Sequence, residues 1–264
     1  MNSDTVKIRG WALQLEYDGT PFIGWQSQRG ESDASGRAIQ SVLETACARL
    51  NGGYPVASIA AGRTDSGVHA EAQIAWVGLG DSFTADTLRE GLNFHMKPNP
   101  VVVVRAAPAL PGWNPRFAAL GRAYRYRILN RRARPALMLN RAWHVRPPLD
   151  DGAMRQAALP LLGLHDFTSF RATACQAKSP VRRIDRLEVV RDGDSIEIII
   201  EARSFLHHQV RNIAGTLKLV GEGKLPVDGM TAILAARERK AAGPTAPPEG
   251  LSLTRVWYET DPFG

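Results

Sequence analysis

The sequence predicts an α/β protein of the α+β type, built from two split-βαβ-like halves. We expect their antiparallel or mixed sheets to meet at a central cleft, with helices packed on the sheet faces. Three observations predict this fold: segments of alternating apolar residues, apolar residues at helical spacing between them, and one element order that recurs in both halves. A chain of 264 residues is long enough for each half to bury its own core.

The first half has the expected order β-α-β-β-α-β, which is typical of a four-stranded antiparallel sheet with its helices on one face. Its strands alternate apolar and polar residues at about 11–17, 56–61, 70–77 and 100–106. The first helix has apolar residues at helical spacing from Ile39 to Leu50. The second covers about 84–95, with Thr84 as its expected cap and with Leu88, Leu92 and His95 along one side.

The second half repeats this order without repeating the sequence. A strand at 122–130 precedes a helix that starts near Asp150, and a hairpin then turns at Asp192-Gly193-Asp194. The remaining elements are hairpin strands at 182–191 and 195–202, a helix that ends at Gly221, a helix near 229–240 and a strand at about 251–258. Pro108, Pro111 and Gly112 mark the boundary between the halves. We therefore expect an N-terminal domain at 1–110 and a C-terminal domain at 111–264.

Composition and charge restrict the class of protein. With 44% apolar and 22% charged residues the chain is globular, and its net charge of +7 favours an anionic partner. No run of 18 to 20 uncharged apolar residues indicates a membrane span, and no export signal is visible at the start. The chain has two cysteines, Cys47 and Cys175, which is too few for a disulfide framework. We expect a cytoplasmic protein.

The positive charge is concentrated in residues 113–147, which contain nine arginines and no acidic residue. The rest of the chain then has 24 basic against 26 acidic residues. Within this segment a strand would place Tyr124 and Tyr126 on one face and Arg125 and Arg127 on the other. Arginines pair with phosphates and aromatic rings stack on bases, so the segment predicts a surface that binds a polyanion. The alternative is a solvated surface strand with its aromatic residues in the core.

A loop between two strands carries the chemical motif Gly62-Arg63-Thr64-Asp65-Ser66-Gly67-Val68-His69. Its glycines allow a tight bend and the close approach of a ligand. An aspartate beside an arginine stays ionised and can act as a base or a nucleophile. The alternative is a structural aspartate that caps its own turn. The loop lacks the Gly-Lys-Ser/Thr ending of a phosphate-binding P-loop.

This motif closely resembles the catalytic motif of the tRNA pseudouridine synthase A family, in which alanine is usual at the position of Ser66. The resemblance runs nearly from end to end of the chain. Its other segments are Leu15-Glu16-Tyr17-Asp18-Gly19-Thr20, Gly24-Trp25-Gln26, Tyr124-Arg125-Tyr126, Asp166-Phe167-Thr168-Ser169-Phe170 and His207-His208-Gln209-Val210-Arg211-Asn212. Several matches in the right order are more specific than any single one.

The resemblance implies a role for individual residues. Asp65 corresponds to the catalytic aspartate, Arg63 to the arginine that helps to displace the target nucleotide, and Tyr124 to the tyrosine that stacks on the uracil. Arg211 resembles the basic residue of the C-terminal half that pairs with the aspartate.

The resemblance also implies RNA contacts, partners and a substrate. Arg116 and Phe117, and the stretch with Cys175, Gln176 and Lys178, resemble RNA-contacting segments, although Ala174 and Ala177 depart from the common form of that stretch. The family implies a homodimer, no cofactor, and uridines 38, 39 and 40 of the tRNA anticodon arm as substrates.

The reaction agrees with the residues present. Pseudouridine forms when the N1–C1′ bond breaks, the uracil rotates and C5 joins C1′, so a single carboxylate suffices. That carboxylate could add to the sugar or base, or remove a ribose proton, and the residues leave these routes open. Adjacent His207 and His208 diverge on a helix, so we expect no metal site. Two further alternatives are a pseudouridine synthase for another tRNA position and a non-catalytic RNA-binding module.

Overall fold

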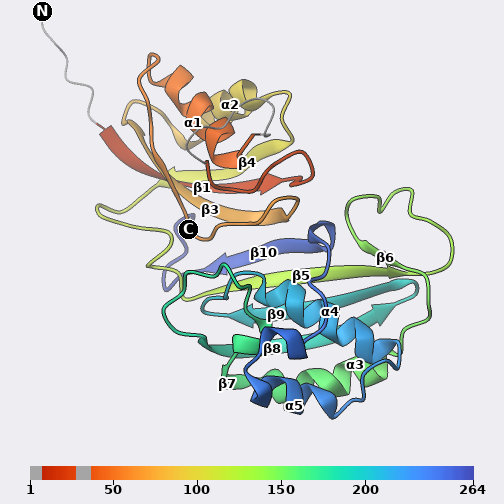
Figure 1. The fold of residues 1–264 in the computed structure, drawn as a ribbon. Coiled ribbons are helices and arrows are strands. Elements are labelled where there is room, and N and C mark those ends of the chain that lie inside the picture. The colour runs from red at the N-terminus through yellow and green to blue at the C-terminus, as the bar shows by residue number, and fades with distance from the viewer. Residues whose placement is uncertain (1–7, 28–36) are drawn as a thin grey trace, which may run out of the picture. The chain divides into compact units, whose positions relative to one another are not determined.

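The computed structural model describes residues 8–27 and 37–264. Its contacts divide the chain into two compact units, Met1–Leu120 with Leu253–Gly264, and Gly121–Ser252 (Figure 1). The expected division at 110/111 differs from this grouping, because residues 111–120 and 253–264 both group with the first unit. The elements are mixed α/β with mostly antiparallel strand pairing, which confirms the expected fold class. The central cleft between the halves stays a prediction.

The first unit has the split-βαβ arrangement that its element order predicts. Its elements are β1 (Ile8–Tyr17), α1 (Ile39–Leu50), β2 (Ser58–Ala60), β3 (His69–Gly80), α2 (Ala85–Met96) and β4 (Val101–Pro108). The strand order is β4-β1-β3, and β2 pairs with β3. All three of these pairings are antiparallel. Strands that are distant in sequence therefore lie side by side, and the loop between β2 and β3 is held at one end of the sheet.

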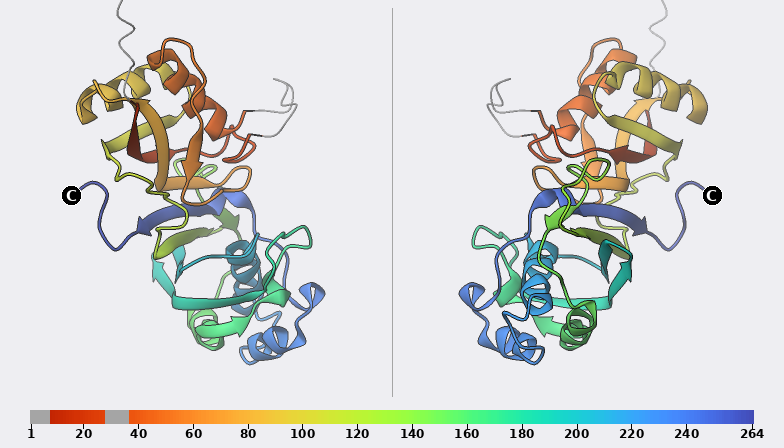
Figure 2. Two further views of the ribbon diagram at one scale, coloured as in Figure 1. Left: turned by 90° about the vertical axis from the view of Figure 1, so that its left-hand side faces the viewer. Right: turned by 90° about the vertical axis from the view of Figure 1, so that its right-hand side faces the viewer.

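Both helices of the first unit lie on one face of its sheet (Figures 1 and 2). Thr84 begins α2 with a capping box, in which the Thr84 and Thr87 side chains each bond the other residue's backbone. A Cβ atom added to Gly91 of α2 would lie 3.1 Å from Leu50 of α1, so this glycine permits the close packing of the two helices. The apolar residues at helical spacing in α1 and α2 are therefore buried together, between the two helices and the sheet.

The strands of the second unit pair mostly antiparallel. Its elements are β5 (Gly121–Asn130), β6 (Trp143–Val145), α3 (Asp151–Ala158), β7 (Gly163–Asp166), β8 (Val181–Asp192), β9 (Ser195–Ala202), α4 (Gln209–Gly221) and α5 (Gly229–Ala236), and the last strand, β10 (Leu251–Trp257), begins in this unit. The strand order is β5-β9-β8-β7, and β6 pairs with β5 in parallel. The hairpin turns at Asp192–Asp194 as predicted, because Asp192 pairs with Ser195.

Three features of the second unit were not predicted from the sequence. The strands β6 and β7 have three and four residues, which is too short for a visible alternation. The helix expected near 229–240 is shorter, because α5 ends at Ala236 and Arg237 adopts the left-handed conformation with φ 49°. A left-handed residue ends the regular hydrogen-bond pattern of a helix.

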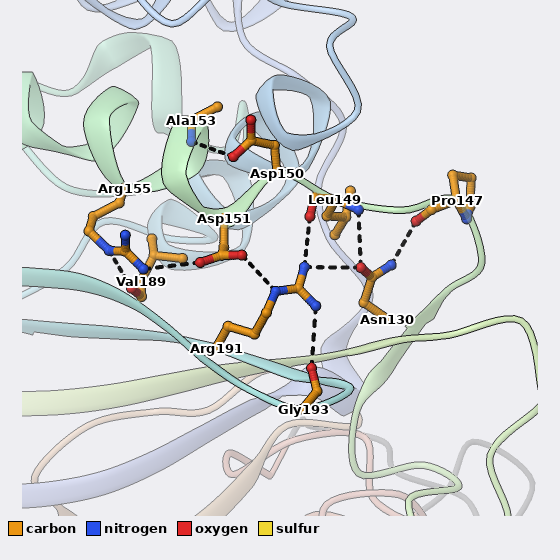
Figure 3. Close-up of polar contacts among 10 residues, drawn as sticks. All are labelled: Asn130, Pro147, Leu149, Asp150, Asp151, Ala153, Arg155, Val189, Arg191 and Gly193. Atoms are coloured by element: carbon orange, nitrogen blue, oxygen red, sulfur yellow. Dashed lines mark hydrogen bonds and ion pairs between the residues drawn. The ribbon is translucent and has the colours of Figure 1, made fainter.

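A network of polar contacts ties the end of β8 to the start of α3 (Figure 3). Arg191 donates hydrogen bonds to Asp151 (2.6 Å), to the Leu149 carbonyl (2.7 Å) and to the Asn130 side chain (3.2 Å). The hydrogen bond from Arg191 holds the pKa of Asp151 below its usual value. Asn130 in turn donates to the Pro147 carbonyl, so the ends of β5 and β8 and the start of α3 are held together.

Among the described residues, no helix combines the length and apolar character that crossing a membrane requires.

Candidate active site

The loop that carries Asp65 connects β2 to β3 and is paired with a second loop at 18–25. The backbone of Asp65 forms an antiparallel bridge with Gly24, and the Trp25 N–H donates to the Thr64 carbonyl at 3.0 Å. The Gly67 N–H and the Ser66 hydroxyl both donate to the Phe22 carbonyl, at 3.3 and 3.2 Å. Two sequence segments that the family resemblance singled out separately therefore form one structural unit.

Gly24 makes this pairing of loops possible. It has a φ of 113°, a conformation that favours glycine, and a Cβ atom there would lie 2.7 Å from the Thr64 carbonyl oxygen. A side chain at this position would therefore push the second loop away from the residue that precedes Asp65.

Buried polar side chains support the Asp65 loop from below. The Tyr17 hydroxyl and the Thr64 hydroxyl form a hydrogen bond of 2.8 Å, and both residues are buried. Gln73 of β3, which has no exposed surface, donates to the Gly62 carbonyl at 2.7 Å. The backbone is thus held on both sides of Arg63. Arg63 itself is exposed and Asp65 is half-buried, so both side chains extend from a backbone that is held in place.

Tyr124 and Tyr126 of β5 lie in different environments although they share a face of the strand. Tyr126 is fully buried and donates from its hydroxyl to the Pro247 carbonyl at 2.8 Å. Its burial raises the pKa of Tyr126 well above the usual value. Tyr124 is half-buried, and its ring meets the ring of Phe205 edge-on at 5.3 Å. Tyr124 is therefore the member of the pair whose ring has an accessible part.

Arg211 lies in the first turn of α4, next to a dense set of hydrogen bonds. Its Nε donates to the Ala246 carbonyl at 2.8 Å, and the residue is half-buried. The neighbouring Asn212 is fully buried, donates to the Phe170 carbonyl and accepts a hydrogen bond from the Thr245 hydroxyl. The start of α4 is therefore fixed to two segments that lie far from it in sequence.

The segment with Cys175, Gln176 and Lys178 is exposed at two of these three positions, and Cys175 is half-buried. Arg171 shapes it by donating to the carbonyls of Cys175 (2.6 Å) and Ala177 (2.8 Å). Burial alone would raise the pKa of the Cys175 thiol. Hydrogen bonds from the backbone at Ala177 and His207 and from Arg171 outweigh that effect and lower this pKa. The Cys175 thiol therefore loses its proton more readily than the thiol of an ordinary cysteine.

Arg116 and Phe117 lie on a turn of the first unit. The side chain of Asn114 accepts hydrogen bonds from the backbone N–H groups of Arg116 (2.9 Å) and Phe117 (3.3 Å). Phe117 is 78% exposed, so a large aromatic ring stands in solvent beside an exposed arginine. Such a pair can offer a stacking face and a cation to RNA.

Comparison with known proteins gives similarity to one family over nearly the whole chain. A protein named tRNA pseudouridine synthase A from Acidiphilium cryptum is 60% identical over 97% of this chain and 99% of its own length. Proteins of the same name from Rhodospirillum centenum and Gluconobacter oxydans are 54% and 52% identical, over 95% and 99% of this chain and 100% and 94% of their own lengths. The chain belongs to the tRNA pseudouridine synthase A family. The resemblance seen in the sequence motifs is thereby confirmed.

A family model described as tRNA pseudouridine synthase also matches, over residues 157–259. This range includes Arg211 and the Cys175 segment and excludes Asp65. For the first unit, membership of the tRNA pseudouridine synthase A family therefore rests on the full-length relatives.

The basic segment of this family member has less uncompensated charge than its sequence suggests. Arg125 and Arg127 both contact Glu197 of β9, with nitrogen–oxygen distances of 3.6 and 2.9 Å. Arg131 lies 3.4 Å from Asp194 in the hairpin turn. The segment itself contains no acidic residue, but the fold places acidic residues from sixty or more positions away in sequence next to it. The polyanion-binding surface stays a prediction. Exposed arginines of the segment are Arg116, Arg132, Arg134, Arg141 and Arg146.

Sequence reasoning missed Gln73 as part of the site. The signal that could have found it is a single amide within an otherwise apolar part of β3, since buried amides need hydrogen-bond partners. Tyr17 was noted as a motif residue, but its contact with Thr64 could not be read from a separation of 47 residues.

Proposed function

We propose that this protein isomerises uridine to pseudouridine in tRNA, at positions 38, 39 and 40 of the anticodon stem-loop, with Asp65 as the catalytic carboxylate. The observation that carries the proposal is the Asp65 loop. Its backbone is bonded to a second loop and to buried side chains on both sides of Arg63, while Asp65 stays half-buried. The full-length relatives are named tRNA pseudouridine synthase A, which supports the reaction and the tRNA substrate.

A carboxylate on a rigid backbone suits the reaction. The N1–C1′ bond must break and a C5–C1′ bond must form at one sugar carbon, so the reacting oxygen has to be placed accurately. The uracil is detached, turned and rejoined without gain or loss of atoms, which requires no oxidant, reductant or energy source. The Asp65 carboxylate supplies the anionic oxygen that adds to the nucleoside or removes its proton.

Other residues have supporting roles in the proposal. The accessible part of the Tyr124 ring stacks on the displaced uracil, and the exposed Arg63 helps to displace the nucleotide from its stack. Arg211, oriented by its bond to the Ala246 carbonyl, pairs with the carboxylate. Arg116, Phe117, Cys175, Gln176 and Lys178 contact the RNA. The enzyme acts in the cytoplasm as a homodimer and uses no cofactor or metal.

The alternatives make different demands on the structure. A non-catalytic RNA-binding module needs exposed arginines and aromatic rings, but it does not need a carboxylate on a doubly supported loop. A synthase for another tRNA position would use the same loop and differ in its RNA contacts.

Mapping of pseudouridine in tRNA tests the proposal. The purified protein is incubated with an unmodified tRNA transcript that has uridines at positions 38, 39 and 40, and with three transcripts that each have cytidine at one of them. We expect pseudouridine at each remaining uridine of this set and none in the T arm. Pseudouridine only at other positions would support a synthase of different specificity, and binding without any pseudouridine would support the RNA-binding module.

A further inference from the structure

His69, the first residue of β3, lies at the junction of the two paired loops. The residue is 5% exposed, and its Nδ1 accepts a hydrogen bond from the Gly19 backbone N–H at 3.0 Å. A ring nitrogen that accepts a hydrogen bond carries no hydrogen, so the neutral ring holds its hydrogen on Nε2. Among the described residues, Nε2 is buried without a hydrogen-bond partner. The side chain of His69 therefore makes its hydrogen bond to Gly19 through Nδ1 alone.

The turn that His69 contacts is fixed by its own side chains as well. Asp18 accepts hydrogen bonds from the Thr20 N–H (3.0 Å) and the Thr20 hydroxyl (2.6 Å) through the same oxygen that lies 3.2 Å from His69 Nδ1. The Gly19 carbonyl accepts a hydrogen bond from the Phe22 N–H at 2.9 Å. His69 thus holds the beginning of a compact turn, and hydrogen bonds within that turn connect residues 18 to 22.

This turn continues directly into the contacts of the Asp65 loop. A Cβ atom on Gly19 would overlap the carbonyl oxygen of Val68, so the two loops touch backbone to backbone next to His69. Further along, Phe22 accepts the hydrogen bonds from Ser66 and Gly67, and Gly24 bridges Asp65. His69 therefore closes one end of a ladder between the loops, and Asp65 lies at the other end.

We infer that His69 is a positioning residue for Asp65. Its Nδ1 holds the Gly19 backbone by a hydrogen bond and so fixes the loop at 18–25. This loop in turn pairs with the backbone of Asp65 and sets the position of its carboxylate. The inference rests on the proposed role of Asp65. His69 touches no reacting atom in this scheme. Removing its acceptor would let the loops shift relative to each other and would lower turnover, while leaving the exposed RNA-contacting residues unchanged.

A matched pair of variants tests the acceptor separately from the space that the ring fills. In His69→Asn the amide oxygen is bonded to Cγ, as Nδ1 is in histidine, so this oxygen can accept the hydrogen bond from the Gly19 N–H. His69→Leu has nearly the same shape as the asparagine variant but no acceptor. We expect His69→Leu to lower kcat about tenfold or more with KM for tRNA within about twofold of wild type, since small misplacements at a reacting centre are costly. His69→Asn should keep most of the wild-type kcat.

Amide hydrogen exchange gives a second readout that does not depend on activity. In His69→Leu the amides of Gly19 and of residues 62–68 should exchange faster than in His69→Asn. Equal kcat values in the two variants, or a rise in KM without a change in kcat, would overturn the inference. If the leucine variant does not fold, His69→Gln replaces it, because its longer side chain displaces the amide from the Nδ1 position. Wild-type protein without pseudouridine activity would contradict the proposed function, and the exchange comparison would still decide the role of His69 in holding the loops.

Discussion

The Asp65 loop and the Cys175 segment hold their side chains in opposite ways. Around Asp65, the buried side chains of Tyr17 in β1 and Gln73 in β3 form hydrogen bonds with the loop, at Thr64 and Gly62. The Cys175 segment is shaped mainly by one half-buried arginine, Arg171, and presents exposed side chains. The difference matches the proposed tasks. Chemistry at one carbon atom needs a fixed oxygen, whereas contact with a phosphate backbone tolerates side chains that move.

The largest expected effect on activity comes from a substitution in the Asp65 loop. Asp65→Asn should reduce pseudouridine formation by about a thousandfold or more, because asparagine keeps the size of the side chain but is neither an anionic nucleophile nor a useful base. Binding of tRNA should stay close to wild type, since RNA affinity comes mainly from phosphate contacts and stacking. Activity and tRNA affinity are measured on the same preparation.

Mass spectrometry must exclude deamidation of the asparagine back to aspartate in that preparation. Substantial activity of the intact Asp65→Asn protein would contradict the assignment of Asp65.

Gln73→Leu tests whether the buried support matters for turnover as well as for stability. The substitution removes the amide that donates to the Gly62 carbonyl. Leaving this carbonyl without the donor should lower the free energy of unfolding by about 1–3 kcal/mol. We expect a decrease in kcat of about tenfold as well, because the backbone beside Arg63 is released. Denaturant unfolding and single-turnover kinetics provide the two measurements.

Asn93→Leu is a suitable control for Gln73→Leu. Asn93 of α2 exchanges two hydrogen bonds with Val103 of β4 in the same unit. The control should lose stability by a similar amount and keep its kcat. A comparable fall in kcat for both variants would show that stability alone explains the effect.

Tyr124 tests the side chain proposed to stack on the uracil. Tyr124→Phe keeps the ring face, and Tyr124→Leu removes it, so the leucine variant should lose more activity. Stacking on a base is worth about 1–3 kcal/mol, which corresponds to a loss of roughly 5-fold to 160-fold. Single-turnover rates at saturating tRNA measure the difference. Equal impairment of both variants would assign the effect to the hydroxyl group.

The smallest expected effect concerns tRNA affinity and the exposed arginines of the basic segment at 113–147. Replacing Arg132 and Arg134, which are exposed, should flatten the dependence of tRNA affinity on salt by up to about 0.9 per lost phosphate contact in the log–log slope. Replacing Arg125 and Arg127 should flatten it less, because Glu197 already offsets part of their charge. Binding titrations at several salt concentrations measure both slopes, and a larger change for the Arg125 and Arg127 pair would contradict this view.

Local patterns predicted most of the fold. The hairpin and the helices with apolar seams could be recognised because their periodicity lies within a few turns of the chain. The strands β6 and β7 escaped notice because three or four residues show no period. The end of α5 depends on the left-handed conformation of Arg237, which no local signal announced.

The parts of the site that could not be predicted from the sequence are contacts between residues that lie far apart in the chain. The glycines and charged side chains of the motif indicated the Asp65 loop, but the partners of that loop come from β1, from β3 and from the loop at 18–25. The pairing of Arg125 and Arg127 with Glu197 depends on the register of β5 and β9, which places residue 127 opposite residue 197. Such register cannot be read from one strand alone.

The return of the chain to its first unit has a consequence for biosynthesis. Leu253 is fully buried there, the Leu120 N–H donates to the Trp257 carbonyl at 2.9 Å, and Tyr258 donates to the Pro115 carbonyl at 3.0 Å. Arg105 of the edge strand β4 contacts Asp261 and lies over the ring of Phe263. These contacts form after residues 253–264 have emerged from the ribosome. The unit that is translated first is therefore the one completed last, and Gly121–Ser252 is synthesised in full before its neighbour can close.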